Sequence, residues 1–458
     1  KVGFPPAARP HPSNLPEKFL AYNTDCIVLV IHAHIHGLAC CPRPIILMET
    51  QVIILGGGCG GLWLHYFLAQ RKYGCVLVDS NMLGGYASTH CQNRLHNGSY
   101  YAVLGSSTEL KEMGKLCTRA AENVQEFCLD NCPDAIERTS GSIYLFERRE
   151  LVEKAHHNVK ELGVRSTILG STELEGMERI LTGARRVPYG LLTDDIPFDS
   201  YRILRALATG AAVEGGEYYR ASDGLQRIRV ERDGGLWKVF DEKTLVATAP
   251  VVVSAAGALI PRLFRRMTGH EAGVEIQQSL IAVFHKPLCN RIISIRSEAY
   301  GPIDLAPFDG GTTVTLGTLE REPGTEGKWD FQRLQDRLTL FLQGLGVMLP
   351  CPVHFYVCDK VNNTSHSGNP YRNCNKRHYF WIDDPRNFIS FYPGKFTTAS
   401  VAAESLLEDT LRDRIDEPRQ PTTRLIEAPQ VARQPYFNTP THLMRPKHGS
   451  YIFERIEG

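Results

Sequence analysis

The sequence predicts an α/β protein in which a parallel, helix-covered sheet is interrupted by an inserted antiparallel sheet. Three observations lead to this fold class. An apolar run is followed by glycines in Gly-x-Gly-x-x-Gly spacing and then by a helix-like segment. Further β-branched runs end on an acid or on small residues, as parallel strands do where they approach a ligand. From Ser279 to Thr318 the pattern changes to longer strands of alternating apolar and polar residues, which is typical of an antiparallel sheet.

The first predicted unit runs from Gln51 to about Arg71. Val52 to Leu55 is short, apolar and β-branched, as expected of a buried parallel strand. Gly56 would permit the tight strand-to-helix turn, Gly58 would let the backbone approach a pyrophosphate, and Gly61 would let the helix pack closely on the strand. The free N–H groups and the positive dipole end at the start of the helix favour binding of phosphate.

A second strand then supplies an acid. Cys75 to Val78 is apolar and is followed by Asp79, 18 residues beyond Gly61, where a carboxylate accepts hydrogen bonds from an adenosine ribose. A glycine motif alone would be weak evidence, but strand, glycines, helix, second strand and acid occur here in register. The unit therefore predicts a dinucleotide site, against the alternative of a glycine-rich loop between ordinary elements.

Composition sets the broad class. The 458 residues suffice for two domains or for one domain with a large insertion, and a hydrophobic content of 43% with 22% charged residues is ordinary for a globular protein. The net charge of +1 gives no reason to expect nucleic acid or an anionic membrane as a partner. The 13 cysteines include no Cys-x-x-Cys pair, so we expect core thiols, a reducing compartment and a cytoplasmic location, with no metal site.

The two ends differ from the rest of the chain. Residues 1–47 begin without Met and are rich in Pro and His, so we expect an upstream extension that is disordered or not native. Its apolar patch, Cys26 to Cys41, is too short and too polar to span a bilayer, and its alternating His residues have no second ligand cluster. Residues 415–458 are rich in Pro, Arg and Gln, and we assign no structure to this tail.

Periodicity and turn residues place the remaining elements. Helices are predicted at 109–132, 149–162, 199–208, 329–345 and 399–412, the third with Asp199 as its N-cap. Strands are predicted at 141–146, 225–231, 236–241, 250–258 and 388–393, with a hairpin turn at 233–235. Residues 362–374 are predicted to form a polar loop.

Several separated stretches also match one pattern in one order, over about residues 48–412. They are the phosphate turn 51–61, Asp79, the Ser-Thr-x-x-x-x-Arg-Leu-His-x-Gly loop 88–98, and residues 199–207, 251–258, 309–317 and 394–398. Together they resemble the FAD-dependent oxidoreductases of the D-amino-acid oxidase superfamily, which includes glycine and sarcosine oxidases, glycerol-3-phosphate dehydrogenase and L-2-hydroxyglutarate oxidase. A domain that binds only NAD or S-adenosylmethionine would not need the Gly-Lys-Phe-Thr stretch at 394–397.

The resemblance implies a Rossmann-like FAD-binding domain with an inserted antiparallel-sheet substrate domain (α+β). The first would comprise residues 48–140, 196–272 and 375–414, and the second residues 141–195 and 273–374. The implied FAD contacts are Gly56, Gly58, Gly61, Asp79, Ser88, Thr89, Gly257, Gly394, Lys395, Phe396 and Thr397. The family usually has Glu in place of Asp79, so we expect the shorter arm to reach the ribose with a lower affinity for FAD.

The stretch Arg94 to Tyr101 bears on the substrate, because it is similar to a stretch of the 2-hydroxyglutarate oxidases. Removing a hydride from CH–OH requires a base for the hydroxyl proton, and a histidine suits that role, so His96 is our candidate base. An equal alternative is that His96 only bonds the flavin or a backbone carbonyl. An anionic substrate would need a cation, for which Arg377 is our first candidate and Arg296 our second.

Other residues remain open at this stage. Tyr100 and Tyr300 could donate hydroxyl hydrogen bonds or lie in the core, and His90 or Cys91 could tether FAD covalently. We predict an FAD-dependent dehydrogenase or oxidase that takes hydride from a small 2-hydroxy acid or polyol phosphate. The alternatives are an amine or amino-acid oxidase and a non-catalytic FAD-binding protein. The sequence does not identify the electron acceptor, and it predicts neither a nucleic-acid partner nor a membrane segment.

Overall fold

The computed structural model describes most of the chain after residue 47. The described ranges are 48–418, 430–431, 443–446 and 453–456, with internal gaps at 80–81, 137–140, 183–185, 223, 226, 298–300, 309, 322–339, 345–353, 364–371 and 376–378. Residues 1–47 and the helix expected at 329–345, apart from its last turns, therefore lie outside the described residues.

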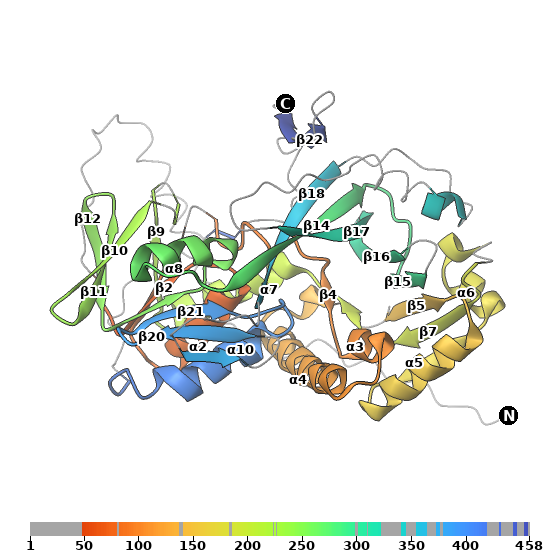
Figure 1. Cartoon of the computed structure of the whole chain (residues 1–458), viewed down its shortest axis with the longest axis horizontal. Coiled ribbons are helices and arrows are strands. Elements are labelled where there is room, and N and C mark those ends of the chain that lie inside the picture. The colour runs from red at the N-terminus through yellow and green to blue at the C-terminus, as the bar shows by residue number, and fades with distance from the viewer. Residues whose placement is uncertain are drawn as a thin grey trace, which may run out of the picture. The chain divides into compact units, whose positions relative to one another are not determined.

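A seven-stranded sheet contains the predicted dinucleotide unit (Figure 1). Its order is β19 (Arg372–Asn375), β20 (Phe380–Asp384), β21 (Phe388–Tyr392), β13 (Val251–Ser254), β2 (Val52–Leu55), β3 (Cys75–Asp79) and β9 (Glu217–Arg220). The five strands from β21 to β9 are parallel, and β20 and β19 are antiparallel additions at one edge. Every residue of β13, β2 and β3 is buried, which explains their continuous apolar runs. The predicted parallel sheet is confirmed.

The two faces of this sheet have different covers. Val52 and Ile54 pack into a core formed with helices, and Ile53 and Leu55 pack into the core of the opposite face. The helices are α2 (Cys59–Gln70), α4 (Thr108–Asn131), α7 (Ser200–Val213) and α10 (Ala399–Leu406), which continues to Leu411. The opposite face carries α8 (Ile260–Thr268) and a four-stranded sheet in the order β1 (Met48–Glu49), β12 (Thr244–Ala249), β11 (Leu236–Asp241) and β10 (Ile228–Asp233). Asp199 caps α7 as predicted, because its carboxylate accepts from the Arg202 amide at 3.2 Å.

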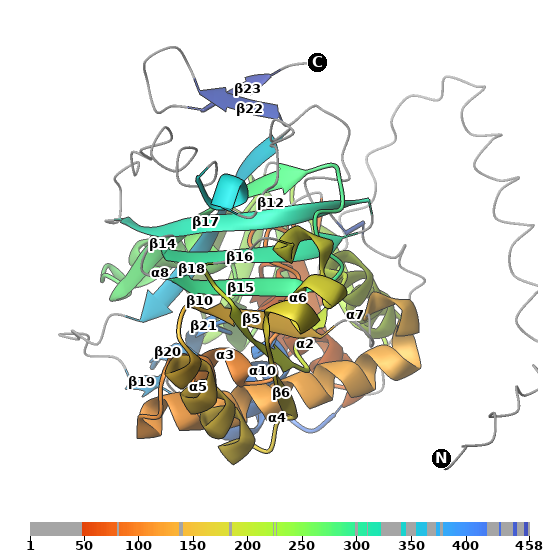
Figure 2. The same cartoon turned by 90° about the vertical axis from the view of Figure 1, so that its right-hand side faces the viewer.

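An eight-stranded sheet forms the second large layer (Figure 2). Its order is β18 (His354–Asn363), β14 (Val274–Phe284), β17 (Gly311–Arg321), β16 (Gly301–Phe308), β15 (Ile292–Ser297), β5 (Ser142–Phe146), β7 (Tyr189–Thr193) and β6 (Ser166–Leu169). All pairs are antiparallel except β5 with β15, which run parallel and join residues 142–193 to residues 274–363 in one sheet. Helices α5 (Arg149–Glu161) and α6 (Ser171–Met177) accompany this sheet, and short 3₁₀ turns occur at Pro133–Ala135, Arg179–Leu181 and Gly257–Leu259.

Two sequence predictions about loops were wrong. The polar loop expected at 362–374 is partly strand, because β18 extends through Asn363 and β19 begins at Arg372, and both are edge strands of their sheets. The tail expected to lack structure contains an antiparallel pair, β22 (Leu443–Pro446) and β23 (Phe453–Ile456), closed by local backbone pairing. The ranges proposed for the two domains stay a prediction.

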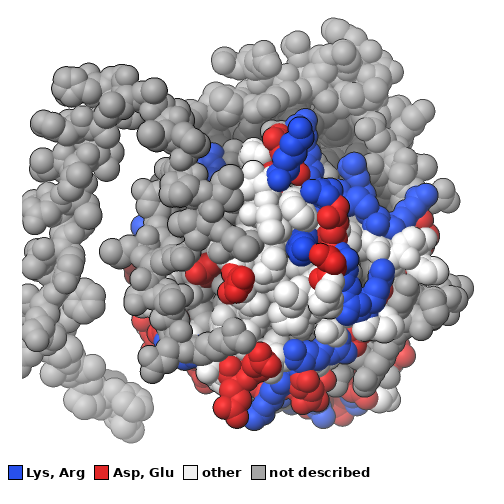
Figure 3. All heavy atoms as spheres, turned by 90° about the vertical axis from the view of Figure 1, so that its left-hand side faces the viewer, with Lys and Arg blue, Asp and Glu red and all other residues white. Residues whose placement is uncertain are grey.

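Surface charge, helix hydrophobicity and the cysteines bear on the broad class of the protein. On the face drawn in Figure 3, basic and acidic side chains are interspersed, in keeping with the net charge of +1. No helix among the described residues combines the length and the apolar character needed to cross a lipid bilayer. Eight of the cysteines in the described ranges are free thiols.

Candidate active site

The turn between β2 and α2 can be built only with glycine at two positions. Gly56 has φ of +113°, and a Cβ there would lie 2.7 Å from the carbonyl oxygen of Ala255 in the neighbouring strand segment. A Cβ at Gly61 would lie 1.9 Å from the carbonyl oxygen of Gly56. Both distances are below any real Cβ contact, so the first turn of α2 packs directly against the end of β2.

Gly58 differs from these two glycines. It is the N-cap of α2 with φ of −73° and ψ of −178°, a conformation that any residue adopts. The atom that a Cβ would meet is the Ser88 hydroxyl oxygen, at 3.1 Å, and that hydroxyl accepts from the Cys59 amide at 2.8 Å. The packing of the protein therefore gives little reason for glycine at this position. A cofactor phosphate that approaches the backbone gives one, so the turn fits FAD.

Asp79 closes the same turn from the end of β3. Its side chain is buried, and Oδ2 accepts a hydrogen bond of 2.5 Å from the Gly57 amide. A charged acceptor on a backbone amide holds the glycine turn in place. Binding of the ribose by Asp79 stays a prediction.

The loop after β3 follows the turn and then reaches the second sheet. Thr89 is buried and donates its hydroxyl to the Gly84 carbonyl at 2.7 Å, which makes it a support of the loop rather than an exposed ligand group. The Gln92 amide donates to the Thr315 hydroxyl in β17 at 2.8 Å. Burial raises the pKa of the Cys91 thiol to about 12, so a thiolate that could attack a flavin is not favoured there.

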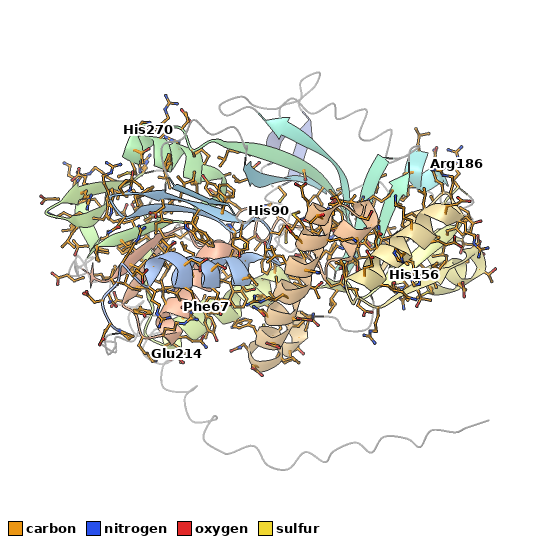
Figure 4. All side chains as sticks on the ribbon, turned by 60° about the horizontal axis from the view of Figure 1, so that its bottom comes forward. Phe67, His90, His156, Arg186, Glu214 and His270 are labelled. Atoms are coloured by element: carbon orange, nitrogen blue, oxygen red, sulfur yellow. The ribbon has the colours of Figure 1, made fainter. Side chains whose placement is uncertain are left out.

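His90 belongs to this loop. Figure 4 shows His90 in the middle of the view, well apart from His156 on α5 and from His270, which follows α8. The His90 Nδ1 atom is 2.8 Å from the Tyr86 carbonyl oxygen. In the described residues no group of His, Cys, Asp and Glu could hold a metal ion.

The Gly-Lys-Phe-Thr turn lies against the loop that carries His96. Gly394 has φ of +78°, and the Lys395 amide donates to the Thr398 hydroxyl at 3.0 Å, which tightens the turn before α10. The Thr397 hydroxyl accepts from the His96 amide at 3.1 Å, although the two residues are 301 positions apart. The Phe396 ring lies 4.7 Å from the ring of Phe198. The turn therefore brings its lysine to the short strand β4 (Arg94–Leu95), which leads into helix α3 (Ser99–Leu104).

Three basic residues converge on the ring of Tyr100, at the start of α3. The His96 ring centroid lies 5.4 Å from that of Tyr100, edge to face. The Arg296 guanidinium carbon lies 5.0 Å from the Tyr100 centroid, and the Lys395 ammonium lies 5.3 Å from it and 5.4 Å from the centroid of Tyr101. We call His96, Tyr100, Arg296 and Lys395 the Tyr100 cluster. It brings together residues of three separate segments and gives the candidate site a positive charge.

Much of this positive charge is not neutralised. The Lys395 ammonium makes no ion pair with any residue in the described ranges. Arg296 is 15% exposed and donates from Nη2 to Asp304 at 3.3 Å, and its Nε is buried without a hydrogen-bond partner in the described part of the chain. An anion placed near Tyr100 would therefore find available donors.

The structure describes one of the two candidate arginines. Arg377 and Tyr300 lie outside the described residues, whereas the second candidate, Arg296, is in the cluster. Gly257, which begins the 3₁₀ turn after β13, has φ of +56° with open space around its Cβ position. The sequence analysis missed two buried residues beside the cluster, Arg94 and Asp195. A cue was available for Arg94, because it belongs to the Ser-Thr-x-x-x-x-Arg-Leu-His-x-Gly loop at 88–98.

Comparisons with known proteins agree with this geometry. The family model described as FAD dependent oxidoreductase matches residues 51–387. A probable FAD-dependent oxidoreductase of Pseudomonas aeruginosa is 42% identical over 65 residues, which are 14% of this chain and 17% of that relative. The match thus spans about a sixth of the curated relative.

Solved structures show the same fold at low identity. Glycine oxidase from Geobacillus kaustophilus has a TM-score of 0.60 and 18% identity, over 83% of this chain and 100% of that one. L-alpha-glycerophosphate oxidase from Mycoplasma pneumoniae with FAD bound has a TM-score of 0.61 and 14% identity, over 84% and 98% of the two chains. One is named for an amino acid and the other for a glycerol phosphate, so the fold alone does not choose between C–N and C–O substrates.

Proposed function

We propose that this chain, which belongs to the family of FAD-dependent oxidoreductases, is an enzyme that oxidises a CH–OH group of a small anionic substrate. The observation that carries the proposal is the convergence of His96, Arg296 and Lys395 on the ring of Tyr100. When bound, FAD supplies the acceptor for the hydride. The residues of the cluster supply the remaining requirements, which are a base and a binding site for an anion.

His96 is the proposed base. Its side chain is 93% buried, and its backbone is held by Thr397, so the ring has a defined place beside Tyr100. A neutral imidazole can accept the hydroxyl proton as the C–H bond breaks. Amine oxidation needs no such base when the amine enters neutral, which favours an alcohol substrate.

Arg296 and Lys395 are the proposed anion ligands. The guanidinium can bind a carboxylate or phosphate with two parallel hydrogen bonds, and the ammonium adds a point charge. Asp304 forms an ion pair with Arg296, whereas Lys395 has no ion-pair partner within the described ranges. The site therefore favours a 2-hydroxy acid or a polyol phosphate over a neutral alcohol.

The test is anaerobic reduction of the FAD-loaded protein. We expect 2-hydroxyglutarate or glycerol 3-phosphate to bleach the visible flavin bands, and glycine and sarcosine to leave them unchanged. Bleaching by glycine or sarcosine would replace the proposal with amine oxidation, and a flavin that no compound reduces would contradict an enzymatic role on these substrate classes.

Two variants separate the proposed roles. His96→Gln should lower kcat by roughly 10²- to 10⁴-fold, because general base catalysis has that magnitude. Arg296→Gln should raise KM for the anionic substrate by roughly tenfold or more, and Arg296→Lys, which keeps the charge, should raise it less. Equal KM values for Arg296→Gln and the unchanged protein would remove Arg296 from the anion site.

A further inference from the structure

A buried arginine stands two residues before the candidate base. The Arg94 side chain is 2% exposed, and its guanidinium donates hydrogen bonds to two strands of the eight-stranded sheet, β5 and β15, and to the segment before β8 (Ile196–Pro197). Nε donates to Asp195 Oδ2 at 3.0 Å, and Nη1 donates to the Ser294 hydroxyl at 2.5 Å. Nη2 donates to the Tyr144 hydroxyl and to Asp195. Arg94 thus links the strand that leads to His96 with the second sheet.

Asp195 is bonded to the chain on both sides of His96. Its side chain is fully buried, and Oδ1 accepts from the Asn97 amide at 2.8 Å while Oδ2 accepts from Arg94. The Tyr144 hydroxyl donates to Oδ2 at 2.7 Å. Burial holds the pKa of Tyr144 well above its ordinary value, so this hydroxyl keeps the proton that it donates. One carboxylate therefore fixes the backbone immediately after His96 and the side chain two residues before it.

The same bonds continue to the anion ligand. The Ser294 hydroxyl donates to Asp304 Oδ1 at 2.6 Å, and Arg296 Nη2 donates to that oxygen at 3.3 Å. Arg94 Nη1 is 3.7 Å from it. Two cations and two carboxylates thus form one network that reaches from the backbone at Asn97 to the guanidinium of Arg296.

Fold stability gives little reason for such a network. Moving charges out of water costs free energy, and the attraction between the buried charges often only offsets that cost. Apolar residues of similar size would stabilise the core equally well. A fixed geometry gives a better reason, because catalysis requires the base and the substrate ligand at a set separation. The network joins β4 and the residue after His96 to β5, β15 and β16 of the eight-stranded sheet, so it sets that separation directly.

We propose that Asp195 is a positioning residue for His96, and that the network it forms with Arg94, Ser294 and Asp304 holds His96 and Arg296 at a fixed separation. The kinetic part of this inference rests on the proposed function, whereas its structural part does not. Loss of the Asp195 charge leaves Arg94 without its main partner and frees the backbone at Asn97. His96 then moves, although neither Asp195 nor Arg94 needs to touch the substrate.

The chain offers a matched control in Glu178. This carboxylate is 1% exposed, accepts from the Asn290 amide at 3.0 Å and pairs with Arg291 at 3.4 Å. It therefore resembles Asp195 in burial and in having one amide and one arginine partner. Arg291 precedes Arg296 by five residues at the other end of the β15 segment, roughly 17 Å along an extended strand. Glu178→Gln removes a buried charge of the same kind away from the Tyr100 cluster.

The experiment compares Asp195→Asn with Glu178→Gln in two assays on the full chain. Amide hydrogen exchange of the peptide that spans residues 93–101 is measured without and with FAD, and the rate of flavin reduction is measured in the FAD-loaded protein. We expect both variants to have a lower Tm. We expect only Asp195→Asn to exchange faster in this peptide, by roughly tenfold or more, and to reduce flavin more slowly, by roughly 10²-fold.

A milder variant keeps the test decisive if Asp195→Asn does not fold. Tyr144→Phe removes one hydrogen bond to Asp195 and keeps the ring, and we expect roughly three- to tenfold changes in the same directions. Exchange and reduction rates of the Asp195 or Tyr144 variants that match those of Glu178→Gln would overturn the inference. If no substrate reduces the unchanged protein, the proposed function fails, and the exchange comparison still decides whether Asp195 positions the His96 segment.

Discussion

The substitution Gly58→Ala should weaken FAD binding while leaving the apoprotein nearly as stable as before. In the folded chain Gly58 has the extended conformation of an ordinary N-cap, so alanine adds no backbone strain. Its methyl group would lie 3.1 Å from the Ser88 hydroxyl, a contact that a shift of a few tenths of an ångström relieves. Alanine is a poorer N-cap than glycine but restricts the unfolded chain, and these effects nearly offset each other, to within about 1 kcal/mol.

The cost falls on the cofactor. A methyl group between the backbone and a pyrophosphate acts as an overpacked contact of about 1–3 kcal/mol, which corresponds to a Kd for FAD that is roughly 5- to 150-fold higher. The assay is titration of the apoprotein with FAD by flavin fluorescence, together with urea denaturation of the apoprotein.

Gly170→Ala is the matched control for this prediction. Gly170 is also an extended N-cap, with φ of −91° and ψ of 176°, and a Cβ there would meet only Glu173, at 3.7 Å. It precedes α6, away from the turn between β2 and α2. A Gly58→Ala protein that folds and binds FAD as tightly as Gly170→Ala would refute the argument that this glycine is kept for the cofactor. A large loss of apoprotein stability at Gly58 alone would refute the claim that protein packing tolerates a methyl group there.

Three further substitutions test the fold around the turn. Gly61→Ala should lower the free energy of unfolding of the apoprotein by about 3 kcal/mol or more, because the alanine Cβ would lie 1.9 Å from the Gly56 carbonyl oxygen. A urea denaturation curve close to that of the unchanged protein would contradict this. Asp79→Ala should lower the free energy of unfolding by about 1–3 kcal/mol, because the Gly57 amide loses its buried acceptor. It should also weaken FAD binding. An unchanged urea midpoint would count against a stabilising role of that hydrogen bond. Burial lowers the pKa of His65 from 6.5 to about 4, so the unfolded chain takes up this proton first as the pH falls, and stability is lost between those values. His65→Gln should remove about 2 kcal/mol of the stability difference between pH 7 and pH 5, and an equally steep decline with pH in the variant would show that another group is responsible.

The phosphate turn could be predicted from the sequence because its constraints are local. Gly56 needs a positive φ, and Gly61 meets the carbonyl oxygen of Gly56 only five residues away, so the spacing of the glycines encodes the turn. The α7 N-cap and the Gly234–Gly235 hairpin follow from equally local rules. The edge strand β19 was missed because pairing with β20, rather than an apolar pattern, makes it a strand.

The sequence by itself determined the order of the elements, the dinucleotide turn and the family resemblance, and it predicted His96 as a candidate base and Lys395 as an FAD contact. Only the tertiary structure showed that Arg296 lies over Tyr100, and that Asp195 bonds to Arg94 from 101 positions away. The physical reason is that local periodicity reports which face of an element is apolar, not which distant polar groups meet there. The side chains of Arg94, Asp195 and Asp304 look like ordinary surface charges in the sequence, and the packing of β4 against the second sheet is what buries and pairs them.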